Sequence, residues 1–265
     1  MPISSVFIIR HAERLDHIDK QWQPDLSLGI SDPPITAHGQ HQAIETGHAL
    51  HDLILQQNPE SPQIIIYTSP FQRCIDTSIG LAQQLPWHVT LRLEIGLSEW
   101  LSEEFFESVC PAAHLISHHQ ERLARQQTLA YSMRAKNQAS YFPSHLHIDY
   151  GHQSVYREFE YPEDYKDMIE RFERTRLACL KQADDQNKAV VIFVTHAVGA
   201  NALLDGFRNR VTIPLKSNYC SLSCVRPSMP HSVNSSDQSE DEFDDLRIRP
   251  AWKIELTMSD THLTK

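Results

Sequence analysis

The amino-acid sequence predicts a three-layer α/β/α fold built on a mainly parallel central sheet. Short apolar runs rich in β-branched residues alternate along the chain with longer segments of helical periodicity, an order typical of parallel sheets covered by helices on both faces. A length of 265 residues and a hydrophobic content of 40% are sufficient for a substantial core. We therefore expect a single domain over residues 1–265.

Five apolar runs are predicted to form the strands, and most have the continuous apolar character of strands buried on both faces. In chain order they are residues 5–9 (SVFII), 64–68 (IIIYT), 89–93 (VTLRL), 189–195 (AVVIFVT) and 251–257 (AWKIELT).

Helical segments separate these strands. Residues 36–57 carry apolar residues at helical spacing, and Thr36 is placed to cap this helix. After the second strand, Ser69 is expected to cap the next helix and Pro70 to occupy its first position. Two more helices are expected, over residues 161–182 and 197–207.

Two segments do not follow the alternation. Residues 101–160 are polar, rich in histidine and without a clear strand, so we expect a partly helical insertion over the end of the sheet that carries the active site. Residues 226–249 are rich in Ser, Pro and acidic residues and are expected to form an acidic mobile loop. Its run DQSEDEFDD (237–245) is interpreted as solvated, with a partner-docking segment as the alternative.

The composition excludes several classes of protein. A formal net charge of −10 without a basic patch disfavours direct nucleic-acid binding. No apolar run approaches the roughly 18 residues of a membrane span, and the N-terminus lacks the features of a signal peptide. We expect a cytoplasmic protein without a membrane partner, with the nucleus as an alternative location.

The cysteines are odd in number and scattered, which argues against a disulfide framework and for a reducing compartment. Cys220 and Cys224 are interpreted as ordinary strand residues, because two positions four apart in a strand lie roughly 13 Å from each other, too far for a disulfide. The remaining cysteines are Cys74, Cys110 and Cys179.

Charged and polar side chains follow the predicted strands at the points where they end. Arg10 and His11 follow the first strand, Arg73 follows the second, and His196 follows the run at 189–195. Glu99 lies in the segment EIGLSEW, which follows the third strand. Ligands bind beyond the carboxyl ends of the strands in open α/β sheets, so these groups are predicted to converge at one edge.

The convergent arginines predict an anion site. Arg10, Arg14 and Arg73 would repel one another unless a multiply charged anion lay between them, and guanidinium groups suit bidentate phosphate contacts. His11 is then a candidate nucleophile, because neighbouring cations favour its neutral form. A desolvated, protonated Glu99 could donate a proton to the leaving oxygen and afterwards activate water.

The histidine-rich stretch HLISHH raises the question of a metal site. His114 and His118 have the i, i+4 spacing of helical zinc ligands, but no third ligand is evident. We interpret them as surface residues and expect neither a metal nor a cofactor.

The motifs RHAER, DPPITAHGQHQA, TSPFQRCIDT, GLSEW and VTHA resemble the histidine phosphatase superfamily, also called phosphoglycerate-mutase-like. The resemblance runs to about residue 225, with a gap over the insertion. It implies the phosphoglycerate-mutase-like fold, His11 as the phosphorylated nucleophile and Glu99 as the proton donor. It also implies phosphate binding by Arg10, Arg14, Arg73 and His196, and no metal.

Within the superfamily, the motifs are most similar to the branch that contains the suppressor-of-T-cell-receptor-signalling phosphatases and the phosphatase-like subunit of fungal transcription factor IIIC. One departure is Ala12, where the family usually has Gly; a methyl group there could crowd the phosphate or restrict the backbone.

The resemblance implies a phosphomonoesterase, with aryl phosphates or phosphotyrosine as expected substrates. The expected partner is therefore a phosphorylated small molecule or a phosphoprotein. Two alternatives stay open: a catalytically weak interaction module or transcription-complex subunit, and a phosphosugar mutase. A homodimer is also left open.

Overall fold

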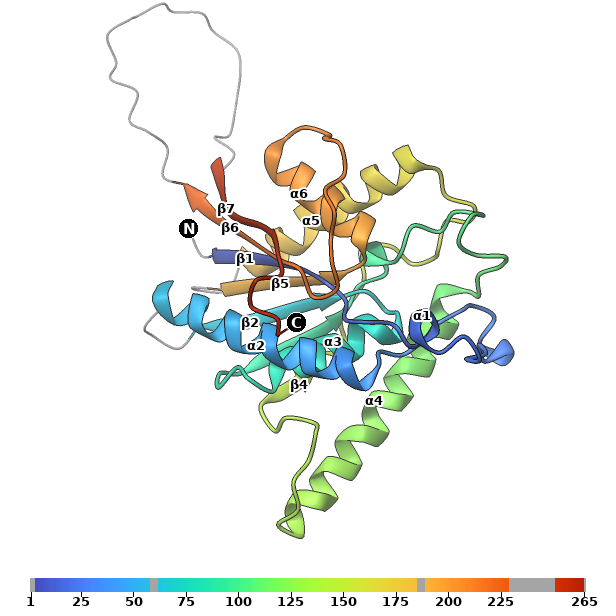
Figure 1. The fold of residues 1–265 in the computed structure, drawn as a ribbon, viewed down its shortest axis with the longest axis vertical. Helices are drawn as coiled ribbons and strands as arrows, with labels where there is room; N and C mark the ends of the chain where they lie inside the picture. The colour runs from blue at the N-terminus through green and yellow to red at the C-terminus, as the bar shows by residue number, and fades with distance from the viewer. Residues whose placement is uncertain (1–2, 58–61, 185–188, 229–250, 265) are drawn as a thin grey trace, which may run out of the picture.

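A computed structural model describes residues 3–57, 62–184, 189–228 and 251–264 (Figure 1). Its centre is a seven-stranded sheet in the order β4-β3-β2-β5-β1-β6-β7. The pairings from β4 to β1 are parallel, whereas β6 pairs antiparallel with both β1 and β7. The predicted fold class is confirmed.

The strands are β1 (Ile3–Arg10), β2 (Gln63–Thr68), β3 (Val89–Leu93), β4 (Leu146–Ile148), β5 (Ala189–Thr195), β6 (Leu222–Ser228) and β7 (Ala251–Ser259). The helices are α1 (Leu15–Ile18), α2 (Ala37–Gln57), α3 (Gln72–Ala82), α4 (Ala112–Ala135), α5 (Tyr165–Asp184) and α6 (Ala197–Arg208). Two short 3₁₀ helices, η1 (Leu26–Leu28) and η2 (Ile95–Leu97), lie in the connections.

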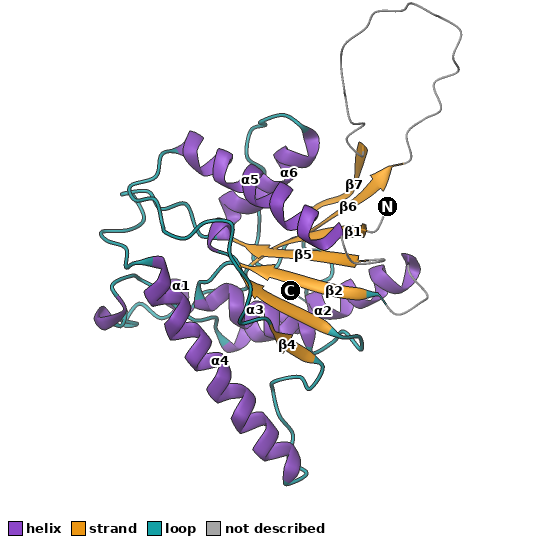
Figure 2. Ribbon diagram, turned by 180° about the vertical axis from the view of Figure 1, so that it is seen from behind, coloured by secondary structure: helices purple, strands orange, loops and turns teal. Residues whose placement is uncertain are grey.

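Helices cover both faces of the sheet, as Figure 2 shows from behind. Alternate residues of a strand face opposite sides, so Phe7 and Ile9 pack in one core cluster with side chains of α2, α3 and α4. Val6 and Ile8 pack in a second cluster with side chains of α5 and α6. The continuous apolar runs of the sequence therefore reflect burial on two faces.

Side-chain caps begin α2 and α5, whereas α1, α3, α4 and α6 have no side-chain cap hydrogen bond. The Thr36 hydroxyl accepts a hydrogen bond from the Gly39 N–H at 2.9 Å, as predicted for the start of α2. Helix α3, however, begins at Gln72 and not with a Ser69 cap and Pro70 in the first position. The Ser69 hydroxyl lies 2.8 Å from Nε2 of His196, so a tertiary contact occupies the group that was expected to cap the helix.

Helix α5 begins at Tyr165, later than the predicted residue 161. Asp164 accepts a hydrogen bond from the Asp167 N–H at 2.8 Å and so caps the helix from the residue before it.

The insertion at 101–160 contains more than the expected helical structure. Besides α4, it supplies β4, which pairs parallel with β3 and extends the sheet at its edge. The expectation that this segment lacks a strand was wrong, because a strand of three residues is too short to leave a pattern in the sequence.

Only the first three residues of the region 226–249, which was expected to form a mobile loop, are described by the structure. Residues 226–228 belong to β6, which corrects the predicted boundary. Residues 229–249, with the acidic run, lie outside the described residues. Cys220 precedes β6 with a positive φ of 53°, so it does not share a strand face with Cys224 as expected. All five cysteines are buried, and none of them forms a disulfide.

Within the described ranges, no helix is both long enough and apolar enough to cross a lipid bilayer.

Candidate active site

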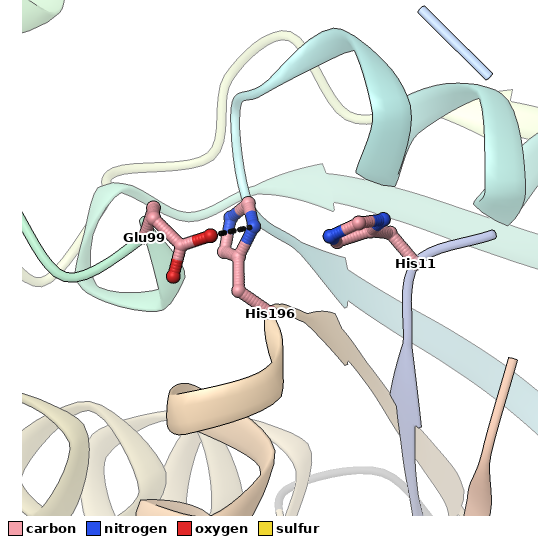
Figure 3. A group of neighbouring side chains, drawn as sticks. All are labelled: His11, Glu99 and His196. Carbon is pink, nitrogen blue, oxygen red and sulfur yellow. Dashed lines mark ion pairs between the residues drawn. The ribbon is translucent and has the colours of Figure 1, made fainter. Parts of the chain in front are cut away.

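Two histidines stand side by side at the carboxyl end of the sheet (Figure 3). Arg10 and Thr195 are paired in the parallel register of β1 and β5, and His11 and His196 are the next residues of each chain segment. The His11 N–H donates to the Thr195 carbonyl at 2.8 Å, which continues the pairing by one residue. The two imidazole rings are consequently 5.3 Å apart between centroids.

His11 is held as a neutral imidazole with one nitrogen free. Its Nδ1 lies 2.8 Å from the carbonyl oxygen of Ala12. A carbonyl can only accept, so Nδ1 carries the proton and Nε2 keeps its lone pair. The side chain is only 1% exposed. Burial and the nearby charges of Arg73 and Arg10 lower the pKa of His11 well below its ordinary value. The predicted neutral form is therefore supported.

The backbone conformation of Ala12 does not require a glycine. It is not among the described non-glycine residues with positive φ. Its buried methyl group packs in a small cluster with Ile35 and Cys220, and its N–H donates to the Thr77 hydroxyl at 3.0 Å. The concern that this alanine needs a glycine-like backbone angle is not supported.

Arg73 is the largest fully buried side chain among the described residues. Its Nη2 lies 3.1 Å from Nδ1 of His196 and 3.4 Å from a carboxylate oxygen of Glu99. Its Nε and Nη1 have no hydrogen-bond partner in the described part of the chain. Unpaired guanidinium donors at a buried site favour an oxyanion ligand.

A carboxylate oxygen of Glu99 lies 3.2 Å from Nδ1 of His196, an ion pair when that imidazole is protonated, drawn as the dashed line in Figure 3. Burial alone would raise the pKa of Glu99, but His196 and Arg73 outweigh it and hold this pKa far below the ordinary value. Glu99 is thus a carboxylate before substrate binds, which corrects the expectation of a protonated residue.

His196 differs from His11 because both of its nitrogens have close neighbours. Nε2 meets the Ser69 hydroxyl at 2.8 Å, and Nδ1 lies between Arg73 and Glu99. Burial lowers the pKa of His196 to about 4, against the opposing charge of Glu99.

The other two predicted arginines have protein partners. Arg10 donates from Nη1 to the Ser217 carbonyl, and its guanidinium lies 4.3 Å from the ring centroid of Tyr219. Arg14 forms a bidentate pair with Asp16 at 3.0 and 2.6 Å. The structure therefore brings four of the predicted site residues together: His11, Arg73, Glu99 and His196. Arg10 lies next to His11, whereas the guanidinium of Arg14 is paired with the Asp16 carboxylate.

Residues 6–109, which carry all of these groups except His196, match the profile of the Histidine phosphatase superfamily (branch 1). The match covers 104 of the 265 residues. This similarity favours a phosphatase but does not resolve the finer branch of the superfamily.

The structure is also similar to two solved structures. Ecdysone phosphate phosphatase (EPPase) from Bombix mori, solved in complex with tungstate, is 20% identical with a TM-score of 0.59, covering 91% of this chain and 98% of that one. YhfR from Bacillus stearothermophilus is 16% identical with a TM-score of 0.52, covering 97% and 98%. At these identities the likeness shows the fold. A comparison with curated proteins gave no match.

One group of side chains at this site has the donor atoms of a metal site. Candidate ligand atoms of His11, Glu99 and His196 lie within 4.8 Å of one another. Two arginines adjoin them, and their fixed positive charge opposes a metal cation and favours an anion. Among the described residues, neither His114 nor His118 belongs to a group of potential metal ligands, and both are exposed.

Sequence reasoning missed four residues that surround this candidate site. Asp32 contacts Arg73, and His119 in turn contacts Asp32. Ser69 contacts His196, and Tyr219 contacts Arg10. A signal for His119 was present, because it stands midway between Leu115 and Leu123 at i, i+4 spacing and therefore on the buried face of α4.

Proposed function

We propose that this protein is a phosphomonoesterase that acts through a phosphohistidine on His11. The observation that carries the proposal is a buried, neutral imidazole with an available Nε2 next to Arg73, whose Nε and Nη1 have no hydrogen-bond partner among the described residues. The lone pair suits attack on phosphorus, and the arginine donors suit the charge on the phosphoryl oxygens.

In the first step, Nε2 of His11 forms a bond to phosphorus while the bond from phosphorus to the ester oxygen breaks. Arg10, Arg14, Arg73 and His196 are the groups proposed to hold the phosphoryl oxygens. For Arg14, this requires the guanidinium to leave Asp16 or to share its donors between that carboxylate and the phosphate.

Glu99 is proposed to give the departing oxygen its proton. The carboxylate is ionised before binding, chiefly because of His196 and Arg73. A bound phosphate dianion counteracts the charge of Arg73 and raises the pKa of Glu99, so the proton is taken up as substrate binds. In the second step, Glu99 removes a proton from water, the water oxygen attacks phosphorus, and the bond to Nε2 breaks with release of phosphate.

An aryl phosphate or a phosphotyrosine side chain is the proposed substrate. The half-buried ring of Tyr219 lies 5.7 Å from the ring of His11, and an aromatic surface next to the nucleophile suits an aromatic leaving group. The sequence resemblance to the suppressor-of-T-cell-receptor-signalling branch agrees with this choice.

The test is phosphate release from p-nitrophenyl phosphate between pH 5 and 8 with a chelator present. Wild type is expected to be active, His11→Ala inactive, and His114→Ala, which changes an exposed histidine, as active as wild type. A folded wild type that is no faster than His11→Ala with this ester and with phosphotyrosine would overturn the proposal and favour the interaction module. Product analysis with 3-phosphoglycerate separates hydrolysis from transfer by a mutase.

A further inference from the structure

A second buried carboxylate, Asp32, adjoins the phosphate-binding arginine. Its side chain is 1% exposed and lies 3.7 Å from Nη1 of Arg73. Both of its oxygens accept the Gln72 N–H, at 2.8 and 3.0 Å, in the first turn of α3. Arg73 therefore lies between two carboxylates, Asp32 on one side and Glu99 on the other.

The strongest contact of Asp32 comes from the insertion. Nε2 of His119, on α4, donates to Asp32 at 2.7 Å, and the imidazole is 0% exposed. Nδ1 of the same ring accepts from Nε of Arg122 at 3.3 Å, which places the ring proton on Nε2, toward Asp32. Arg122 in turn pairs with Asp76 of α3 at 2.6 Å. A hydrogen-bonded chain thus joins α4 to the first turns of α3.

We propose that Asp32 and His119 are positioning residues that keep the free donors of Arg73 available to the phosphoryl group. By this inference, helix α4 helps to position Arg73 for phosphate binding, because it supplies His119, the hydrogen-bond donor to Asp32. The inference rests on the proposed function, because it specifies how the same pocket is held ready for phosphate.

Arg73 and His119 compete for the Asp32 carboxylate. Nη1 of Arg73 is 3.7 Å away, which is within ion-pair range but too far for a hydrogen bond, and it has no other partner among the described residues. The hydrogen bond from His119 partly satisfies the carboxylate and weakens its pull on Arg73. Without that donor, a buried carboxylate would draw Nη1 into direct contact and remove it from the phosphate.

The experiment compares three variants of the full chain. His119→Leu keeps most of the side-chain volume but removes the donor, His119→Gln keeps an N–H donor, and His114→Leu is the matched change at an exposed position of the same helix. Two quantities are measured: the dissociation constant of tungstate by calorimetry, and kcat/KM for p-nitrophenyl phosphate.

For His119→Leu, tungstate binding and kcat/KM are each expected to weaken about tenfold, the effect of one charge-assisted hydrogen bond. His119→Gln is expected to recover most of both, and His114→Leu to match wild type. A lower melting temperature in His119→Leu with unchanged tungstate affinity would show a purely structural role and overturn the inference.

Should His119→Leu not fold, Arg122→Met provides a second route. It removes the donor to Nδ1, so the ring proton is free to leave Nε2, and a loss of about threefold in tungstate affinity is expected. Unchanged affinity in this variant would also overturn the inference. Failure of the proposed function looks different, because wild type itself would then neither bind tungstate nor release phosphate.

Discussion

The ends of β1 and β5 carry the same residue in nearly the same setting, yet the two histidines are bonded differently. His11 and His196 follow neighbouring parallel strands, are almost completely buried, and have lowered pKa values. Within the described part of the chain, His11 makes one side-chain hydrogen bond, to the carbonyl of its own neighbour Ala12, and its Nε2 has no hydrogen-bond partner. His196 has close polar neighbours at both nitrogens, supplied by Ser69, Glu99 and Arg73.

The difference shows that burial alone does not assign a role to a histidine at a strand end. A free lone pair on a fixed ring suits a nucleophile, whereas a ring held at both nitrogens suits a donor of fixed position. We therefore assign covalent chemistry to the end of β1 and stabilisation of charge to the end of β5. Four predictions test this division, in order of decreasing effect.

The largest effect is expected from exchanging each histidine for glutamine. His11→Gln should lose about 10⁴-fold in kcat because the phosphohistidine cannot form, while His196→Gln should lose about 10²-fold because one donor to the phosphoryl oxygens is removed. Rapid acid or alkaline quenching of a reaction with ³²P-labelled ester measures the intermediate. Label should remain on His196→Gln and be absent from His11→Gln; label on His11→Gln would place the nucleophile elsewhere.

The second prediction concerns Glu99, which is proposed to protonate the leaving oxygen and also contacts His196. Glu99→Gln should lose about 10²-fold in kcat with an alkyl phosphate and only about tenfold with p-nitrophenyl phosphate, whose leaving group departs as a stable anion. His196→Gln provides the control, since it should slow both esters equally. An equal loss for both esters in Glu99→Gln would show that the carboxylate only orients His196.

A third effect concerns stability and pH. Burial lowers the pKa of His196 in the folded state to about 4, so the unfolded chain, with an ordinary value of 6.5, takes up the proton first. The contribution of this residue is therefore complete above pH 6.5 and is lost as the pH falls toward 4. It amounts to about 3 kcal/mol of the free energy of unfolding, as an order of magnitude.

Urea unfolding of wild type and His196→Gln at pH 7 and pH 4.5 measures this contribution. The variant should lose less stability than wild type between the two pH values. An equal loss in both proteins would mean that other groups, such as His11, account for the acid sensitivity.

The convergence of these groups was predictable because it follows from topology. Parallel strands end at a common edge, so Arg10, His11 and His196 had to meet once the strands were identified. The ionisation of Glu99 was not predictable, since it depends on the distances to His196 and Arg73 in the folded chain. Likewise, the role of Asp32 depends on a helix that lies 87 residues further along the sequence.

Ser69 gives the smallest effect and shows why a local signal failed. A serine ahead of a helix predicts a cap, but this hydroxyl contacts His196 across 127 residues of sequence. Ser69→Ala should leave Nε2 of His196 with only the weaker contact to the Cys74 sulfur, at 3.6 Å, and lower kcat about fivefold, equivalent to about 1 kcal/mol. Ser78→Ala is the matched control, because that buried hydroxyl bonds only to the Cys74 carbonyl within its own helix. Steady-state kinetics with both esters, together with thermal unfolding, separates the two. Equal activity of the two variants would indicate that Glu99 and Arg73 are sufficient to hold the His196 ring. The hydrogen bond from Ser69 would then not be needed to fix the ring's position.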